Sequence, residues 1–318
     1  AFGALALKRP AVALIVMQDA DEAGYFYNDL HQMMGDGGAL FFPSSYRRAV
    51  KYAHRDAANE VLRTEALTRL RTARAPLYVV THPEALAEMV VSQQRLDERM
   101  LRVVTGRDYK VTRLAATLRE WGFSEVDYVY EPGQFALRGS ILDVYSFNSE
   151  YPYRVDFFGD TADSIRTFEV DTQLSRDRQQ EVEIVPELAQ TTDERVSLLA
   201  FLASVDKDAL LVTKDFTFVR DTIDRVYGEG FARQALAEQM EGATEMEQKA
   251  LREQLRKEAR LISGTRFATE ALGFRRLEIG HRPPAAPDAT VTFHTQPQPL
   301  FHKNFDLLKE LGKCSKPI

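Results

Sequence analysis

The sequence predicts an α/β protein that is interrupted by a β-rich stretch. Apolar runs of strand length alternate with helical patterns over the first hundred residues, and the same alternation returns after Pro186. This alternation is typical of a parallel sheet that is covered by helices on both faces. Between Val126 and Val185, strand patterns follow one another directly, which predicts an inserted α+β domain.

The first α/β stretch contains three predicted strands and three predicted helices. The strands are short apolar runs, and prolines bound two of them, at Pro43 and Pro76. The helices show apolar residues at helical spacing, and the first one is closed by Gly35. Strands are expected at residues 12–17, 39–42 and 77–81, and helices at 21–34, 59–74 and 84–91.

The elements after residue 100 are predicted in the same way. Thr112 is expected to cap a helix whose apolar face holds Leu114, Leu118 and Trp121. Residues 231–262 are highly charged with apolar positions at helical spacing, which favours an amphipathic helix that packs on the core or against a partner helix. Further strands are expected at residues 208–212 and 290–293, and further helices at 218–227 and 302–311.

Composition limits the classes of function. The chain has 318 residues, of which 44% are apolar and 28% are charged, as is usual for a globular protein of two or three domains. The single cysteine, Cys314, excludes an intrachain disulfide and a multi-thiolate metal site and favours a cytoplasmic location. A net charge of −6 argues against a dedicated duplex-binding surface. No apolar run approaches the roughly eighteen residues of a membrane span, so no membrane contact is expected.

Residues 133–175 carry the most specific pattern in the chain. Three short apolar runs alternate there with polar residues, which indicates adjacent antiparallel strands. In the run Y-R-V-D-F-F, the alternation sends Val155 and Phe157 to one face and Arg154 and Phe158 to the other. Strands normally keep aromatic rings for the covered face. An aromatic ring beside an arginine on the polar face is a composition enriched at protein–protein hot spots.

The same stretch resembles a known family. It contains the orders G-x-F-A-x-R-G-x-I-L-D-V, P-x-R-V-D-F-F-G-D and S-I-R-x-F-x-V-D-T-Q-x-S, which begin at Gly133, Pro152 and Ser164. These motifs resemble the UvrA-binding domain that is shared by UvrB and by the N-terminal, UvrB-like module of the bacterial transcription-repair coupling factors (Mfd). Tyr153 after Pro152, together with the run D-T-Q-L-S at residues 171–175, is closer to the coupling factors.

The resemblance implies both a fold and a function. The implied fold is a degenerate RecA-like (P-loop NTPase-like) domain built from residues 1–99 and 189–318, with the α+β UvrA-binding domain inserted at residues 100–188. The sheet of the first segment is then expected to gain a strand from beyond Pro186. The implied function is a non-catalytic module that recruits UvrA and links stalled RNA polymerase to nucleotide excision repair. In the full-length protein, RNA polymerase and double-stranded DNA are expected to bind regions outside this chain, where ATP-driven translocation also lies.

No complete nucleotide-binding motif is found. The phosphate loop G-x-x-x-x-G-K-[ST] has no full copy, because Gly312-Lys313 is followed by Cys314 and Leu307 stands in place of the first glycine. Asp19 follows a strand and is expected to serve turn chemistry rather than to bind magnesium. The six histidines are scattered without ligand spacing. No catalytic residue, cofactor or metal site is therefore predicted.

Two alternatives remain open. UvrB carries a long tyrosine-rich hairpin that clamps DNA, and the equivalent residues 44–59 hold only Tyr46 and Tyr52. This difference favours the coupling-factor module over the first alternative, a fragment of an active UvrB-like ATP-dependent DNA helicase and damage-binding protein. The second alternative is a generic α/β scaffold that binds some other protein.

In the resembled family, UvrA is contacted through residues that match Arg138, Arg154 and Phe158 here. If the hairpin turns near residue 149, Arg138 is expected across from about residue 160, close to Phe158. Arg154 and Phe158 are expected on an exposed face, so replacing either one should leave folding nearly unchanged. The alternative is that both arginines merely neutralise a sheet face. Their partners would then be Asp143, Asp156 or Asp160.

Overall fold

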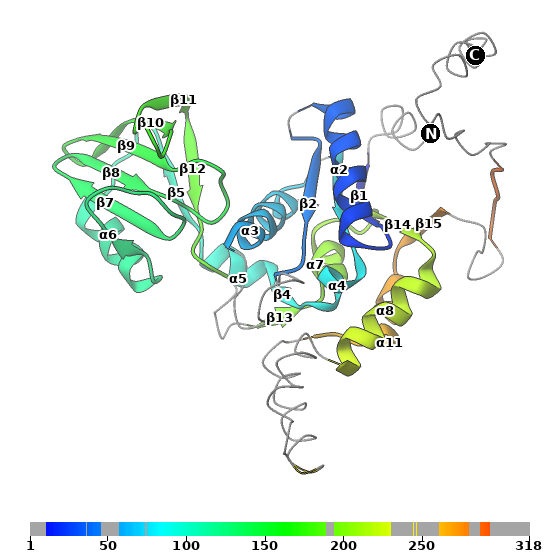
Figure 1. The fold of residues 1–318 in the computed structure, drawn as a ribbon. Helices are drawn as coiled ribbons and strands as arrows, with labels where there is room; N and C mark the ends of the chain where they lie inside the picture. The colour runs from blue at the N-terminus through cyan, green and yellow to red at the C-terminus, as the bar shows by residue number, and fades with distance from the viewer. Residues whose placement is uncertain are drawn as a thin grey trace, which may run out of the picture. The chain divides into compact units, whose positions relative to one another are not determined.

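The computed structural model contains a five-stranded sheet and a six-stranded sheet, joined by helices and two short strand pairs (Figure 1). It describes residues 11–35, 37–45, 57–73, 75–188, 194–229, 244, 246, 261–279 and 287–292. The helices and strands named below belong to the compact unit Ala1–Pro284. In the second unit, Ala285–Ile318, the described residues 287–292 form no helix or strand. The chain is a mixed α/β protein.

The five-stranded sheet is assembled from both flanks of the chain. Its order is β15-β14-β1-β3-β2, and each neighbouring pair runs parallel. Its strands are β1 (Val12–Val16), β2 (Ala39–Phe42), β3 (Leu77–Thr81), β14 (Leu210–Lys214) and β15 (Arg275–Ile279). The prediction that this sheet gains a strand from beyond Pro186 is therefore confirmed.

Helices cover both faces of the parallel sheet, as predicted. Alternate residues of β1 enter different cores: Leu14 and Val16 pack on one side, and Ala13 and Ile15 pack on the other. Helix α2 (Ala20–Met34) closes the second core. The first core is closed by α3 (Ala57–Arg71), α4 (Pro83–Ala87), α7 (Leu198–Val205), α8 (Phe216–Glu229) and α11 (Gly264–Ala271).

The turn that follows β1 is a helix cap. The Asp19 carboxylate accepts a hydrogen bond from the Glu22 amide at 2.8 Å, which satisfies a free donor in the first turn of α2. The helix ends at Gly35, whose φ of 71° is a conformation that glycine adopts easily. The prediction that Asp19 serves turn chemistry is confirmed.

The six-stranded sheet is built from consecutive strands in the middle of the chain. Its order is β11-β10-β9-β8-β7-β6, with β6 parallel to β7 and the other pairs antiparallel. One face packs on helix α6 (Val111–Glu120) over a core that includes Leu118, Leu142 and Val155. The strands are β6 (Ser124–Glu125), β7 (Gln134–Arg138), β8 (Ile141–Val144), β9 (Tyr153–Phe158), β10 (Thr161–Phe168) and β11 (Ser175–Gln179).

A separate antiparallel pair links the two ends of this middle region. Strand β5 (Leu101–Val104) comes before α6, and strand β12 (Glu181–Ile184) follows β11. Their pairing brings residues 101–104 beside residues 181–184. The chain therefore enters and leaves the middle region at neighbouring points.

Three predicted elements differ from the structure. The N-cap of α6 is the extended Lys110, and Thr112 lies inside the helix. The helix predicted at 84–91 ends at Ala87, because the β-branched residues of β4 (Val90–Val91) pair with β13 (Arg195–Val196). Helix α5 (Gln93–Glu98) follows. The strand predicted at 290–293 is not formed over 290–292, which have no strand partner among the described residues.

Several predicted features lie outside the described residues. They are most of the short hairpin region, most of the charged stretch, the last helix and the Gly-Lys pair, at residues 46–56, 231–243, 245, 247–260, 302–311 and 312–313. The predicted strand at 208–212 and helix at 218–227 are present as β14 and α8.

Candidate protein-interaction surface

The predicted site residues lie on the face of the six-stranded sheet that points away from α6. In β9, Val155 and Phe157 are buried in the core under α6, whereas Phe158 is 84% exposed. The predicted alternation of this strand is therefore confirmed. A ring so fully exposed at the end of a strand is a candidate for contact with another protein.

Asp143 lies at the centre of this face. It belongs to β8, and the register places it between Ala136 of β7 and Arg154 of β9. Arg154 donates to it from Nε at 2.7 Å and from Nη2 at 2.8 Å, and Arg138 donates to it from Nη2. Because the Asp143 side chain is completely buried, a single buried carboxylate joins the two predicted arginines.

The guanidinium of Arg154 makes hydrogen bonds and a ring contact within its own domain. Its Nη1 donates to the Gln173 carbonyl at 3.1 Å, and its guanidinium carbon lies 4.4 Å from the centre of the Phe168 ring. Hydrogen bonding to Asp143 raises the pKa of Arg154 above its ordinary value, so the guanidinium stays charged. Only 14% of the side chain is exposed. The expectation of an exposed Arg154 was wrong, because all three guanidinium nitrogens bind groups of the same domain.

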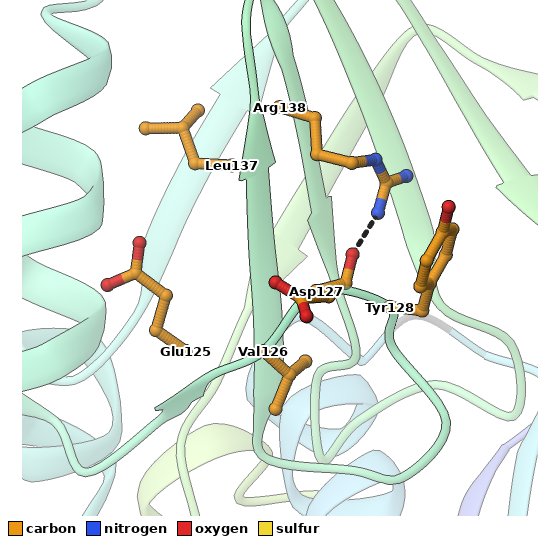
Figure 2. A pocket seen from close by; sticks show the side chains of 6 residues that line it. All are labelled: Glu125, Val126, Asp127, Tyr128, Leu137 and Arg138. Carbon is orange, nitrogen blue, oxygen red and sulfur yellow. Dashed lines mark hydrogen bonds between the residues drawn. The ribbon is translucent and has the colours of Figure 1, made fainter.

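Arg138 is more accessible, with 34% of its side chain exposed. Its Nη1 donates to the Asp127 carbonyl at 2.6 Å, and its guanidinium carbon lies 4.9 Å from the centre of the Tyr128 ring. Figure 2 shows Arg138 and Tyr128 on one side of β7, with Leu137 pointing to the other side. These groups line a pocket of about 630 Å³. Its lining residues are Glu125, Val126, Asp127, Tyr128, Leu137 and Arg138.

The pocket opens where β6 ends. Strand β6 pairs with β7 only through Ser124–Gln134 and Glu125–Phe135. The chain then leaves the sheet, and the segment that carries Tyr128 forms a wall opposite the end of β7 (Figure 2). The outer edge of β7 is therefore accessible beside Arg138.

The predicted position of Arg138 relative to Phe158 was wrong. Arg138 pairs with Ile141 across a tight turn, and Ile141 pairs with Asp156. Strand β8 thus separates β7 from β9, so Arg138 does not lie opposite residue 160. The turn that joins β7 to β8 lies at Gly139, whose φ of 61° suits a two-residue hairpin.

The predicted pairing of both arginines with aspartates is found at one of the three candidate carboxylates. Asp143 binds Arg138 and Arg154. By contrast, Asp156 binds Arg166 at 2.5 Å, and Asp160 binds Lys110, the N-cap residue of α6. Neutralisation of the sheet face and binding of a partner are compatible at Arg138, because its side chain keeps an exposed surface.

Sequence reasoning missed three exposed apolar side chains beside this face. Tyr128 is 52% exposed, and Tyr130 and Leu174 are also exposed. The loops that carry them meet where Gln173 Nε2 donates to the Val129 carbonyl at 3.2 Å. The available signal was the order Y-V-Y at residues 128–130, in which two exposed aromatic residues flank a buried valine.

The arrangement offers a partly exposed guanidinium and exposed aromatic rings. Groups of these kinds are suited to binding carboxylates and apolar side chains of another protein. In the described part of the chain, no group of three or more His, Cys, Asp or Glu side chains is placed to hold a metal ion. None of the described helices is both long enough and apolar enough to cross a membrane.

Comparison with known proteins finds that this region is similar to a known domain family. Residues 101–189 match the model of the UvrB interaction domain. The chain is also similar to proteins named transcription-repair-coupling factor. It is 28% identical over 183 residues to that of Bacillus subtilis (strain 168), 33% over 188 residues to that of Myxococcus xanthus and 30% over 162 residues to that of Escherichia coli (strain K12). The resemblance noted in the sequence is therefore confirmed.

The matched stretches cover much more of this chain than of its relatives. They span 58%, 57% and 51% of the chain, but only 16%, 15% and 14% of the three relatives, respectively. The chain thus spans about a sixth of the length of the curated relatives it matches.

Proposed function

We propose that this chain is a non-catalytic module that recruits UvrA within a transcription-repair coupling factor. One observation carries the proposal: the residues that match the UvrB interaction domain hold a sheet face with an exposed Phe158 and a partly exposed Arg138. Exposed aromatic and arginine side chains are the groups that most often dominate binding between proteins. UvrA is the proposed partner because the motifs of residues 133–175 resemble the UvrA-binding domain.

We assign residues 100–188 to the UvrA-binding domain, and residues 1–99 and 189–318 to two segments of a degenerate RecA-like domain. Strands from both flanks join one parallel sheet, which supports a single domain built from two segments. The β5–β12 pair, which brings the entry and exit of the middle region together, supports an insertion. The RecA-like assignment itself rests on the sequence resemblance.

The three proposed contact residues have different roles. Phe158 supplies an apolar anchor, and Arg138 supplies an accessible positive charge. Arg154 acts through Asp143, because its guanidinium is used within the domain. We therefore treat Arg154 as a positioning residue that holds the face in shape.

The proposed role of the whole protein rests on its relatives, which are named transcription-repair-coupling factors. In such a protein, recruitment of UvrA links stalled RNA polymerase to nucleotide excision repair. Binding of RNA polymerase and double-stranded DNA, and ATP-driven translocation, are assigned to regions outside this chain.

Phe158→Ala is expected to weaken UvrA binding by about 2 kcal/mol, or about thirtyfold, as for a central hot spot. The free energy of unfolding of the Phe158→Ala variant should differ from that of the wild type by no more than about 0.5 kcal/mol, because the Phe158 ring is exposed. Titration calorimetry with UvrA and urea unfolding measure the two quantities.

The neighbouring Phe157 provides a matched control for this prediction. Phe157→Ala removes the same ring from the buried side of the strand, so it should lower the free energy of unfolding by about 3–5 kcal/mol. Wild-type affinity of the Phe158→Ala variant for UvrA would exclude this face as the binding site.

ATP is not expected to stabilise the chain. A ligand raises the melting temperature only if it binds the native state, and the sequence offers no complete phosphate loop. The melting temperature should therefore be the same with and without ATP and magnesium. A clear magnesium-dependent rise would contradict the non-catalytic assignment and favour a fragment of an active UvrB-like helicase.

A further inference from the structure

The ionic cluster beside the pocket, formed by Arg138, Arg154 and Asp143, has an imbalance of charge. Arg138 and Arg154 share the single carboxylate of Asp143, so these three groups carry one more positive charge than negative. Arg154 is largely covered, whereas Arg138 keeps about a third of its side chain in solvent. The surplus positive charge therefore reaches solvent at Arg138, where the pocket opens.

Neither acidic residue of the pocket directs its carboxylate to Arg138. Glu125 accepts hydrogen bonds from Nε and Nη2 of Arg119, at 2.8 and 2.6 Å. Asp127 meets Arg138 through its backbone carbonyl, and its carboxylate points the other way (Figure 2). The carboxylate that binds Arg138 is thus that of Asp143, which accepts a hydrogen bond from Nη2.

Tyr128 gives the pocket an aromatic wall. Its ring lies 4.9 Å from the guanidinium carbon of Arg138, close enough for a cation–π contact that holds the guanidinium in place. Tyr128 is still 52% exposed, and Val126 adds apolar lining. A cation beside aromatic and aliphatic walls fits a carboxylate side chain, whose oxygen atoms bind the guanidinium while its methylene groups pack on the ring.

We propose that Tyr128 is a further partner-contacting residue and that its pocket receives an acidic side chain of the partner. The inference rests on the proposed function, in which the partner is UvrA. The register supports one continuous surface, because Arg138 is opposite Ile141, Ile141 is opposite Asp156, and Phe158 follows two residues later. Three neighbouring strands therefore carry these residues, and an ordinary interface, which buries about 800 Å² on each partner, is large enough to include them.

Substitutions of the tyrosine test its role. Tyr128→Ala is expected to weaken UvrA binding about tenfold, whereas Tyr128→Phe should stay within about twofold of the wild type because the ring is kept. Tyr130→Ala is the matched control, since Tyr130 is exposed on the same loop but is not among the residues that line the pocket. Affinities are measured by calorimetry on the 318-residue chain, and unfolding midpoints confirm that each variant is folded.

A change of charge tests the chemistry of the occupant. Asp127→Asn removes a carboxylate from the lining, so an acidic occupant should bind about twofold to threefold more tightly, with a larger gain at low salt. Arg138→Glu should weaken binding more than Arg138→Ala, because it adds repulsion to the loss of the guanidinium. Weaker binding by Asp127→Asn would overturn the acidic occupant and indicate a basic one.

Failure of this inference can be told apart from failure of the proposed function. If Phe158→Ala weakens UvrA binding and Tyr128→Ala does not, the pocket lies outside the interface and the inference is overturned, while UvrA recruitment stands. If the wild-type chain does not bind UvrA, both are overturned.

Discussion

Asp143→Ala is expected to lower the free energy of unfolding by about 3–5 kcal/mol, the range for removing one partner of a buried ion pair. The Asp143 carboxylate is completely buried and binds both Arg138 and Arg154. Its removal leaves Arg154 charged, mostly covered and without its carboxylate. Urea unfolding can be followed by the fluorescence of Trp121, the single tryptophan, which packs on the core of the same domain.

A double replacement distinguishes two causes of lost stability: the unpaired charge left on Arg154, and the loss of the Asp143–Arg154 ion pair itself. Asp143→Leu combined with Arg154→Met puts apolar groups in place of both ions, and such exchanges are often neutral or stabilising. We expect the double variant to recover most of the stability that Asp143→Ala loses. If Asp143→Ala instead changes the free energy of unfolding by less than about 0.5 kcal/mol, as an ordinary surface substitution does, the carboxylate does not hold this face together. The positioning role of Arg154 would then fail.

The two faces of β9 were predictable from sequence because the alternation of a strand has a period of two whatever its neighbours are. The order of neighbouring strands was not predictable in the same way. A tight turn at Gly139 inserts β8 between β7 and β9, whereas the predicted position of Arg138 assumed only the longer connection near residue 149. One overlooked turn therefore displaced Arg138 by a whole strand.

The ionic contacts were also beyond the sequence. The sequence shows that aspartates and arginines share a face, but burial decides which of them pair. Asp143 is completely buried, and beside this face two loops meet through Gln173 and Val129, which are 44 residues apart in the chain. Arg154 is largely covered, since it packs on Phe168 and binds Gln173. Contacts of such long range depend on how the loops fold over the sheet.

The parallel sheet shows the same limit at its edge. Strands β1 and β3 are continuous apolar runs because both of their faces are covered, and the sequence predicts them well. Strand β15 reads R-R-L-E-I and lies at the end of the strand order, with both arginines exposed. An edge strand needs fewer apolar residues, so the sequence alone did not reveal it.

The double variant Arg138→Ala and Phe158→Ala is expected to weaken UvrA binding by about 4 kcal/mol, or about a thousandfold, if each residue contributes as a hot spot. The two effects should add, because β8 lies between the strands that carry the two side chains. Folding should be affected less than by Asp143→Ala, because Arg154 still binds the buried carboxylate. Arg154→Ala is left out of this test, because this substitution would also remove the ion pair with the buried Asp143.

A matched double variant controls for the loss of one cation and one apolar side chain. Arg275→Ala with Leu272→Ala removes exposed groups of the same kinds from β15 and the end of α11, outside the residues that match the UvrB interaction domain. Its affinity for UvrA should stay within about twofold of the wild type, as expected for residues outside an interface. Equal losses of affinity in the two double variants would mean that UvrA binding depends on net charge and non-specific hydrophobic contact. Full affinity of a folded Arg138→Ala and Phe158→Ala protein would contradict the proposed role of this face in UvrA recognition, because the variant lacks the proposed anchor and the proposed accessible charge while Arg154 still pairs with the buried Asp143.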